Sequence, residues 1–333
     1  FRKTKIYSTE SHCLFVSAGS AGDASNLQNV RNLHVIANEF YDCAGDAIQF
    51  WPKDKVKPTG DVAGLVVDDN DFYVTPAMYT DCKGNLDNGS SGGHCSCSEN
   101  AMDFKVGVKS SSPASADVVK VTRNRIWGYR RADGTAGGAC PNLHDFGYVM
   151  NFHQTESDFV DVDQNLIFDT SNGILTNGGA DNLNITGNIF YNVSQDRGGP
   201  RSGAVRAVFE LGGTTGTIKR NIIVGGDRYL LAGGNAVFSV SDNYFINAGD
   251  WRVFNGGKLS SASSFSGNYY YNTAPYDGSG DIKNNTVSSV SDGIASAYCT
   301  KIKRLTNPTV MCVPNAGISE IVGNSPPMPP SFF

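Results

Sequence analysis

Residues 186–194 read TGNIFYNVS, in which an asparagine is followed by a short run of apolar and aromatic residues. The same arrangement recurs along the chain, at Asn38, Asn70, Asn124, Asn165, Asn188, Asn221, Asn243 and Asn268. The last four of these asparagines are 33, 22 and 25 residues apart. An internal repeat of this length is typical of solenoid proteins, in which each repeat forms one coil and packs against its neighbours.

Each repeat contains short segments in which apolar and polar residues alternate, as strands require. Such a segment precedes the asparagine in LHVIA (33–37), VVKVT (118–122) and NLNIT (182–186), and a second apolar segment follows it after a turn. Two or three strands per repeat predict one coil of a right-handed parallel β-helix, an all-β fold, rather than a propeller blade of ~40–45 residues. We expect the asparagines to stack along the coil axis, hydrogen-bonded to one another. A β-sandwich is the structural alternative.

The composition agrees with a chain of strands and turns. The 333 residues include 38 glycines and 13 prolines, and 18% are charged, which disfavours a helical bundle. Because the repeat covers nearly the whole chain, we predict a single β-helix domain over 1–333. The proline-rich end, NSPPMPPSFF, cannot continue a central strand, so residues from about 300 to 333 are expected to pack on the coil as a loop or tail.

Charge and hydropathy limit the partners that we expect. The net charge of −5 disfavours nucleic acid, which requires a basic surface. No stretch approaches the ~20 apolar residues of a membrane span, so a membrane is not an expected partner either, and we expect a monomer. Residues 100–131 nevertheless contain seven basic and two acidic residues, a local charge of +5 that would attract an anionic substrate.

The cysteines and glycosylation sequons favour a secreted, extracellular glycoprotein. The chain has eight cysteines, and no two have the Cys-x-x-Cys spacing of a zinc site, so disulfides are expected, with a connectivity that spacing does not reveal. Asn-x-Ser/Thr sequons occur at Asn88, Asn184, Asn192 and Asn284.

The functional side chains of a β-helix should lie on the outer face of one sheet. We align DAIQFW (46–51), NAMDFK (100–105), YVMNFH (148–153) and NGILTN (172–177) as strands of successive coils, with AVRAVFE (204–210) following more loosely. If the phenylalanines and methionines point inward, alternation places the following residues outward: Gln49, Trp51, Asp103, Lys105, Asn151, His153, Thr176 or Asn177, Arg206 and Glu210.

These outward residues predict one polar cluster. Adjacent coils lie ~4.8 Å apart, so Lys105 should neighbour His153 and Asp103 should neighbour Asn151. Two long irregular stretches, about 75–98 and 132–146, leave the coil beside these strands and are expected to form the walls of a groove.

The residue types in this cluster suit an acidic polysaccharide. Sugars stack on aromatic rings, and carboxylates pair with arginine. In β-elimination, a base removes the C5 proton, which lies α to a uronate carboxylate, and O4 then leaves. A lysine can be this base only as a neutral amine, which neighbouring arginines and partial burial favour, and a cation must neutralise the carboxylate.

The segment ENAMDFKVG (99–107) resembles the strand that carries the lysine base in right-handed β-helix polysaccharide lyases, the class that includes pectate lyase L and several β-helix alginate lyases. The resemblance implies a secreted lyase that cleaves a uronic-acid polysaccharide such as alginate or pectate. It makes Lys105 the Brønsted base, with Arg130 or His153 neutralising the carboxylate or assisting proton transfer, and Tyr73 or Tyr148 as acid.

The predicted substrate-binding residues are Gln49, Trp51, Asp103, Asn151, Arg206 and Glu210. Calcium is a further expectation from the resemblance, with Glu99 and Asp103 as its ligands, although the dense aspartate cluster of pectate lyase L is not reproduced. Two alternatives stay open. One is a glycoside hydrolase that pairs Asp103 with Glu99 or Glu210, and the other is a noncatalytic glycan-binding or adhesin protein.

Overall fold

The computed structural model describes residues 1–9, 12–18, 30–43, 45–52, 62–75, 100–105, 113–129, 148–153, 158–177, 181–193, 207–226, 228–232, 236–246, 250–253, 259–271 and 286–287. Regular structure in these residues consists of strands alone, β1 to β28. Within the same residues, no helix is long and apolar enough to cross a membrane.

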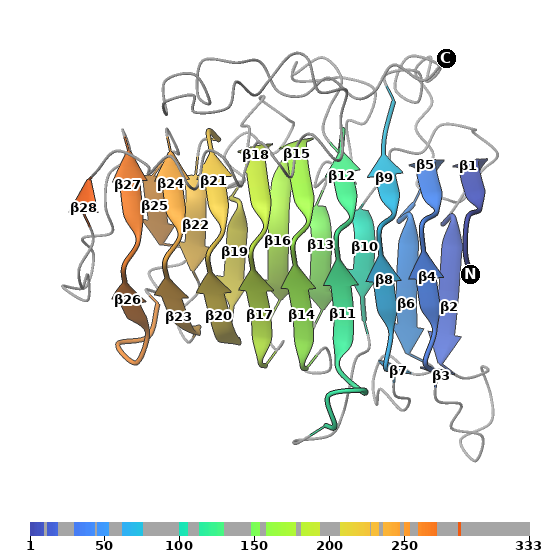
Figure 1. Ribbon diagram of the computed structural model, residues 1–333, viewed down its shortest axis with the longest axis horizontal. Coiled ribbons are helices and arrows are strands. Elements are labelled where there is room, and N and C mark those ends of the chain that lie inside the picture. Colours follow the sequence, from blue (N-terminus) through green and yellow to red (C-terminus); the bar gives the residue numbers. More distant parts are fainter. Residues whose placement is uncertain are drawn as a thin grey trace.

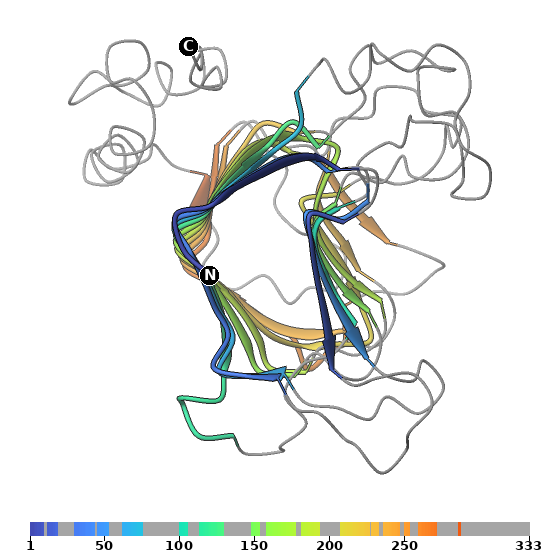
Figure 2. The same ribbon diagram turned by 90° about the vertical axis from the view of Figure 1, so that its right-hand side faces the viewer.

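Nearly all strands belong to three long parallel sheets, which we call A, B and C (Figures 1 and 2). Sheet A contains β4 (His34–Ile36), β8 (Val66–Asp68), β11 (Val119–Thr122), β14 (Val160–Asp163), β17 (Leu183–Thr186), β20 (Thr215–Lys219), β23 (Val237–Ser241) and β26 (Ser264–Ser266). Sheet B contains β1 (Lys5–Thr9), β5 (Glu39–Cys43), β9 (Asp71–Tyr73), β12 (Arg125–Trp127), β15 (Leu166–Thr170), β18 (Ile189–Val193), β21 (Ile222–Val224), β24 (Tyr244–Ile246), β27 (Tyr269–Tyr271) and β28 (Thr286–Val287). Sheet C contains β2 (Leu14–Ala18), β6 (Ile48–Pro52), β10 (Asn100–Phe104), β13 (Tyr148–His153), β16 (Asn172–Asn177), β19 (Phe209–Gly212), β22 (Arg228–Ala232) and β25 (Asp250–Val253). A short parallel pair joins β3 (Val30–Arg31) and β7 (Val62–Ala63).

The chain visits the three sheets in a fixed order. After a strand of sheet A it forms one of sheet B and then one of sheet C, so hydrogen-bonded neighbours come from successive coils. Figure 2, which looks along the coil axis, shows the sheets surrounding one interior. The prediction of an all-β chain of parallel coils is therefore confirmed, and the antiparallel β-sandwich is wrong. The predicted groove walls beyond Thr75 and the tail from about 300 to 333 lie outside the described residues.

The repeated asparagines form the predicted ladder. Each Nδ2 donates a hydrogen bond to Oδ1 of the next asparagine along the axis, at 2.9–3.0 Å, from Asn38 to Asn268. Each of these Oδ1 atoms also accepts the backbone N–H of the preceding asparagine. From Asn70 onward, Nδ2 donates in addition to a backbone carbonyl, at 2.8–2.9 Å. The buried amides therefore satisfy one another from coil to coil.

A left-handed residue precedes every ladder asparagine and turns the chain from sheet A into sheet B. The φ angles of these residues are +54° to +64°, at Ala37, Asp69, Arg123, Gln164, Gly187, Arg220, Asp242 and Gly267. Glycine is the residue that adopts this conformation without strain, yet six of these eight positions carry a side chain. In the first coil, Lys3 (φ 52°) takes the same place, and the backbone N–H of Thr4 donates to Asn38 Oδ1 at 2.9 Å.

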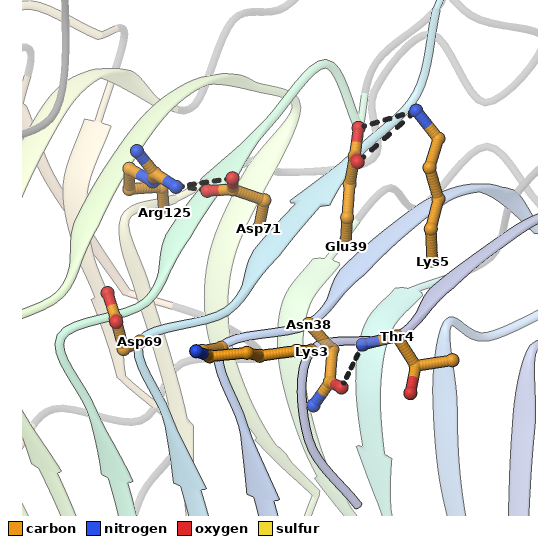
Figure 3. A pocket seen from close by; sticks show the side chains of 9 residues that line it. Lys3, Thr4, Lys5, Asn38, Glu39, Asp69, Asp71 and Arg125 are labelled. Carbon is orange, nitrogen blue, oxygen red and sulfur yellow. Dashed lines mark hydrogen bonds and ion pairs between the residues drawn. The ribbon is translucent and has the colours of Figure 1, made fainter.

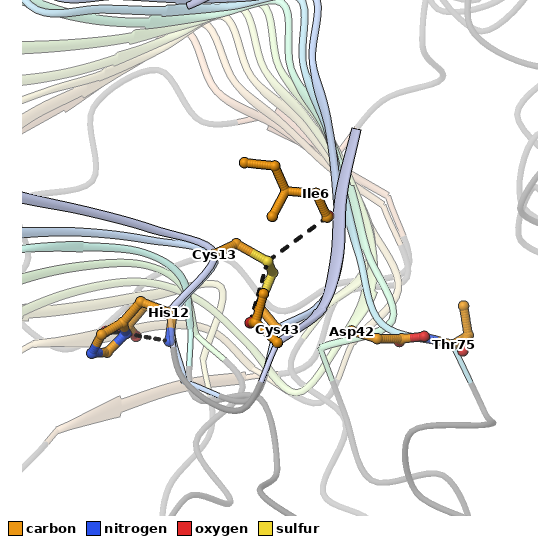
Figure 4. Close-up of a disulfide and its surroundings, with 8 residues drawn as sticks. Ile6, His12, Cys13, Asp42, Cys43 and Thr75 are labelled. Atoms are coloured by element: carbon orange, nitrogen blue, oxygen red, sulfur yellow. Dashed lines mark hydrogen bonds and ion pairs between the residues drawn. A yellow bond between two sulfur atoms is a disulfide. The ribbon is translucent and has the colours of Figure 1, made fainter. Parts of the chain in front are cut away.

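The interior is filled by side chains that stack in register. Phe50, Phe104 and Phe152 lie in neighbouring strands of sheet C, with ring centroids 5.0 and 4.8 Å apart. All three are fully buried, as predicted. In the first coils, a disulfide joins Cys13 and Cys43 where the chain passes from sheet B to sheet C (Figure 4). The other six cysteines lie outside the described residues.

Candidate functional site

The predicted alignment of the sheet C strands is confirmed. Gln49, Asp103 and Asn151 are partners in adjacent strands, and the same row continues through Leu175 to Glu210. Alternation places this row on the outer side of the sheet, because the residues on either side of it in sequence belong to the core, but Gln49, Asp103 and Asn151 are themselves only 3%, 0% and 5% exposed. We call it the sheet C row.

Of the two residues expected outward in the next coil, Thr176 is wrong, because it pairs with Phe152 on the interior side and is 2% exposed. The cause is the register of β16, in which Ile174 lies beside Met150. Alternation places Leu175 and Asn177 outward, so the Asn177 alternative agrees with the backbone register. Asn177 is the partner of His153, and neither side chain is among those described.

Lys105 and Asp103 form an ion pair at the end of β10. The Lys105 Nζ atom lies 2.8 Å from Asp103 Oδ2. The backbone N–H of Lys105 donates to the carbonyl of Phe50, which continues the parallel ladder and keeps the lysine on the same face as Asp103. The Lys105 side chain is 23% exposed and that of Asp103 is fully buried, so the lysine is the accessible member of the pair.

Asp103 is tied to a second buried carboxylate through an amide. Gln49 Nε2 lies 3.1 Å from Asp103 Oδ2 and 2.7 Å from Asp46 Oδ2. Asn100 Nδ2 donates to the other oxygen of Asp46 at 2.7 Å. A continuous polar chain therefore runs from Lys105 to Asp46 across β6 and β10. Sequence reasoning missed Asp46 as a centre of this network, although Asp46 and Asn100 open the two aligned segments.

His12 extends the network into the first coil. Its Nδ1 atom accepts the backbone N–H of Asp46 at 3.0 Å and lies 3.5 Å from Asp46 Oδ2. Because Nδ1 accepts this hydrogen bond, the neutral ring carries its proton on Nε2. A Cβ atom at Gly45 would lie 2.8 Å from the same nitrogen, so the small residue at 45 lets the imidazole approach.

The two tyrosines proposed as acids lie on different sheets. The Tyr148 hydroxyl, on sheet C, donates to Glu210 Oε2 at 2.8 Å. Tyr73 lies on sheet B, where its hydroxyl donates to Glu39 Oε1 at 2.5 Å. Burial, followed by the contact with Glu39, raises the pKa of Tyr73. Tyr73 as the acid beside Lys105 is therefore wrong, because it belongs to another face of the coil, whereas Tyr148 belongs to the same sheet as Lys105.

Several predicted site residues are not described. Arg130, Arg206 and Glu99 lie outside the described residues. Trp51 is the second-last residue of β6 and His153 is the last residue of β13, and the structure describes the backbone of both but neither side chain. The backbone register is informative for the histidine: Phe104 pairs with Phe152, so Lys105 and His153 hold equivalent positions, one residue beyond this pair, in adjacent strands.

The calcium expectation finds no support among the described residues. They contain no group of three His, Cys, Asp or Glu residues that could hold a metal ion. The Lys105 ammonium group already lies 2.8 Å from Asp103 Oδ2, and a positive charge there would repel a cation at the same oxygen. The second predicted ligand, Glu99, lies outside the described residues, so calcium stays a prediction.

Comparison with known proteins adds no family assignment to this geometry. No protein-family profile matches the chain, and no curated protein or solved structure matches it.

Proposed function

We propose that the protein is a secreted polysaccharide lyase that cleaves a uronic-acid-containing chain, such as alginate or pectate, by β-elimination. One observation supports this proposal most strongly. A partly exposed lysine, Lys105, is held on the outer face of sheet C by a fully buried aspartate, in line with a row of amide and carboxylate side chains. The Cys13–Cys43 disulfide supports secretion, because disulfides persist in oxidising compartments.

Lys105 would act as the base in this reaction. The lysine reacts as the neutral amine, so it must give up a proton to solvent and its contact with Asp103 as the substrate enters. Asp103 keeps a hydrogen bond from Gln49 when Lys105 leaves it, which lowers the cost of releasing the amine. The amine then takes the C5 proton, and the electrons of the C5–H bond form the C4–C5 double bond.

Tyr148 would complete the step as the acid. As the C4–O4 bond breaks, O4 takes up its electron pair and receives a proton from the Tyr148 hydroxyl. Tyr148 belongs to β13, the strand adjacent to β10, and its hydroxyl would have to leave Glu210 to reach O4 beside Lys105. Arg130 or His153 would neutralise the uronate carboxylate, and Trp51 and Arg206 would contact the sugars. Gln49 and Asn151 are buried, so they would support the site from beneath rather than contact the sugars as predicted. A proton from the Lys105 ammonium returns to solvent, and the tyrosine regains one, which closes the cycle.

The hydrolase alternative has weaker geometric support. Asp103 and Glu210 belong to β10 and β19, which are three strand steps apart, or about 14 Å at ~4.8 Å per step. The paired carboxylates of glycoside hydrolases lie about 5 to 9.5 Å apart. Asp103 is also fully buried and already paired with a lysine.

The experiment that tests this proposal is incubation with a panel of acidic polysaccharides, with and without a chelator. We expect one uronate polysaccharide to give products that absorb in the ultraviolet, because elimination leaves a conjugated double bond. Lys105→Ala should abolish this signal, and Lys219→Ala, which removes an exposed cation from sheet A, should retain it. Shortened products without the absorbance would favour the hydrolase, and binding without cleavage would favour the glycan-binding module.

A further inference from the structure

A cavity of about 360 Å³ lies over the outer side of sheet B in the first coils, on a different sheet from Lys105 (Figure 3). Its charged lining consists of three cations and three carboxylates: Lys3, Lys5, Arg125, Glu39, Asp69 and Asp71. Four of these come from one row of sheet B, in which Lys5, Glu39, Asp71 and Arg125 are successive partners. The fold therefore gathers charges that are far apart in the sequence.

Two ion pairs form one wall of this cavity. Lys5 Nζ lies 3.2 Å from both carboxylate oxygens of Glu39, and Asp71 contacts the guanidinium of Arg125. Glu39 also accepts a hydrogen bond from the hydroxyl group of Tyr73, so its carboxylate is held in place from two sides. The wall is preorganised, which reduces the entropy lost when a ligand binds.

Lys3 and Asp69 line the opposite side. Both have a left-handed backbone, with φ of 52° and 55°, at the turn from sheet A into sheet B, and both are exposed. Figure 3 shows the Lys3 side chain extending from the Thr4 side of the cavity toward Asp69. Among the described residues, neither the Lys3 ammonium nor the Asp69 carboxylate has an ion pair or a side-chain hydrogen bond, so both can contact a ligand.

We propose that this cavity is a second, noncatalytic sugar site that binds one or two residues of an acidic oligosaccharide. The lining carries no net charge when all six groups are ionised, so an anionic group would be selected locally by the Lys3 ammonium, which has no ion pair among the described residues, rather than by the net charge. The sugar carboxylate would pair with Lys3 and Lys5, and its hydroxyls would donate to Asp69 and Glu39. The three carboxylates would repel a doubly charged phosphate more strongly than a singly charged uronate.

The size and the border of the cavity agree with this ligand. A volume of about 360 Å³ lies near the lower end of the ~300–1,000 Å³ of small-molecule sites, which leaves room for a short oligosaccharide only. Lys5 Nζ lies 4.8 Å from the centre of the Tyr41 ring and 5.8 Å from that of Tyr7. Tyr7 is 53% exposed, so an aromatic surface adjoins the charged cavity, and sugars pack well on such surfaces.

This inference rests on the proposed function for its ligand class, an acidic polysaccharide. A second site on the same molecule would hold the substrate chain near the enzyme between cleavage events and raise its effective concentration. The expected kinetic effect of losing the site is therefore a higher KM for long polysaccharide, with the turnover of short oligosaccharides unchanged.

The test uses the full chain with its lysines converted to ¹³C-dimethyl-lysines, which keeps their charge, and follows them by NMR. Single Lys→Arg variants assign the signals. Sodium galacturonate and sodium glucuronate should each shift the Lys3 and Lys5 signals along a saturable curve and leave that of Lys219 in place. Glucose and inorganic phosphate, at equal concentration and ionic strength, should shift them far less. Lys3→Ala should weaken uronate binding at least fivefold.

The proposal is overturned if the Lys3 and Lys5 signals do not move, if glucose or phosphate moves them equally, or if Lys3→Ala binds uronate as the wild type does. Repeating the titration with Lys105→Ala separates the two sites, because the Lys3 and Lys5 shifts should persist when the Lys105 site is altered. Saturable shifts in a protein that cleaves no polysaccharide would refute the lyase and retain the sugar site. Cleavage of a polysaccharide by a protein whose Lys3 and Lys5 signals do not shift on adding uronate would refute the sugar site alone.

Discussion

The Nζ atom of Lys105 lies 2.8 Å from Oδ2 of Asp103, which is two residues earlier on the same outer face of sheet C. The two side chains differ in exposure: the lysine is 23% exposed and the aspartate is fully buried. The buried partner is held by Gln49, which also contacts Asp46, so the position of the lysine depends on residues of two coils.

Replacing this partner should lower the turnover number. Asp103→Asn keeps the shape of the side chain but removes the ion pair with Lys105. The turnover number should fall by about 10- to 100-fold, because the amine is no longer positioned. Steady-state kinetics on the cleaved polysaccharide measure this fall. A turnover number equal to that of the wild type would show that Asp103 does not position Lys105.

The asparagine ladder should be most sensitive in its middle. Asn165→Ala removes an oxygen that accepts two hydrogen bonds from Asn124, one from its side chain and one from its backbone N–H. It also removes the side-chain nitrogen that donates to Asn188 Oδ1. The Asn124 N–H is left without its partner, whereas Asn124 Nδ2 keeps the carbonyl of Val67 and Asn188 Oδ1 keeps the backbone N–H of residue 165, so we expect a loss of about 1–3 kcal/mol in urea unfolding. Asn268→Ala, at the last ladder position among the described residues, removes the same acceptor from Asn243 and is the matched control. Equal losses for the two variants would contradict cooperative stacking.

Asp71 should make the protein less stable as the pH rises. Burial raises the pKa of Asp71 to about 6, although the Arg125 guanidinium opposes the shift, and Glu39 and Asp69 add to it. In the unfolded chain the pKa is about 4, so the folded state binds the extra proton between pH 4 and 6. The contribution of Asp71 is therefore most favourable below pH 4 and is lost as the pH rises through 6, by up to about 2–3 kcal/mol.

This pH dependence can be measured by urea unfolding at pH 4.5 and 7.5. In Asp71→Asn, the difference in the free energy of unfolding between pH 4.5 and 7.5 should be smaller than in the wild type, because residue 71 no longer titrates. Asp242→Asn, which changes an exposed carboxylate in a turn beyond sheet A, should keep the wild-type difference. An Asp71→Asn variant with the wild-type difference would show that another group titrates.

The Cys13–Cys43 disulfide closes a separation of 30 residues in the first coils. A cross-link of this length stabilises a protein by about 3–4 kcal/mol through the entropy of the unfolded chain. The double variant Cys13→Ser with Cys43→Ser should unfold at correspondingly lower urea concentration, without loss of the parallel β signal in circular dichroism. A change below 1 kcal/mol would mean that these cysteines are not bonded in the protein.

The sequence was sufficient for the coil and for one row of the site. The repeated asparagine predicts the coil, because each asparagine side chain hydrogen-bonds the next one along the axis. The similar segments around Met102 and Met150 predict the register that pairs Asp103 with Asn151. Alternation then determines which side chains face outward.

Other features have no such signal in the sequence. The left-handed turns carry residues as different as Arg123 and Gln164, so their conformation follows from the coil closing on its neighbours rather than from residue type. Thr176, one of the two residues predicted to face outward in its coil, faces inward because the register of β16 outweighs polarity, whereas the other, Asn177, pairs with His153. Asp46 precedes its strand, and only the three-dimensional turn brings it to Gln49.

The central claim, elimination by Lys105, is tested most directly by the mass of the products from a uronate polysaccharide. We expect the new non-reducing ends to be lighter by one water than those of hydrolysis, and we expect them to vanish in Lys105→Arg while Lys219→Arg forms them at the wild-type rate. Products that retain the water, or a Lys105→Arg variant as active as the wild type, would contradict it.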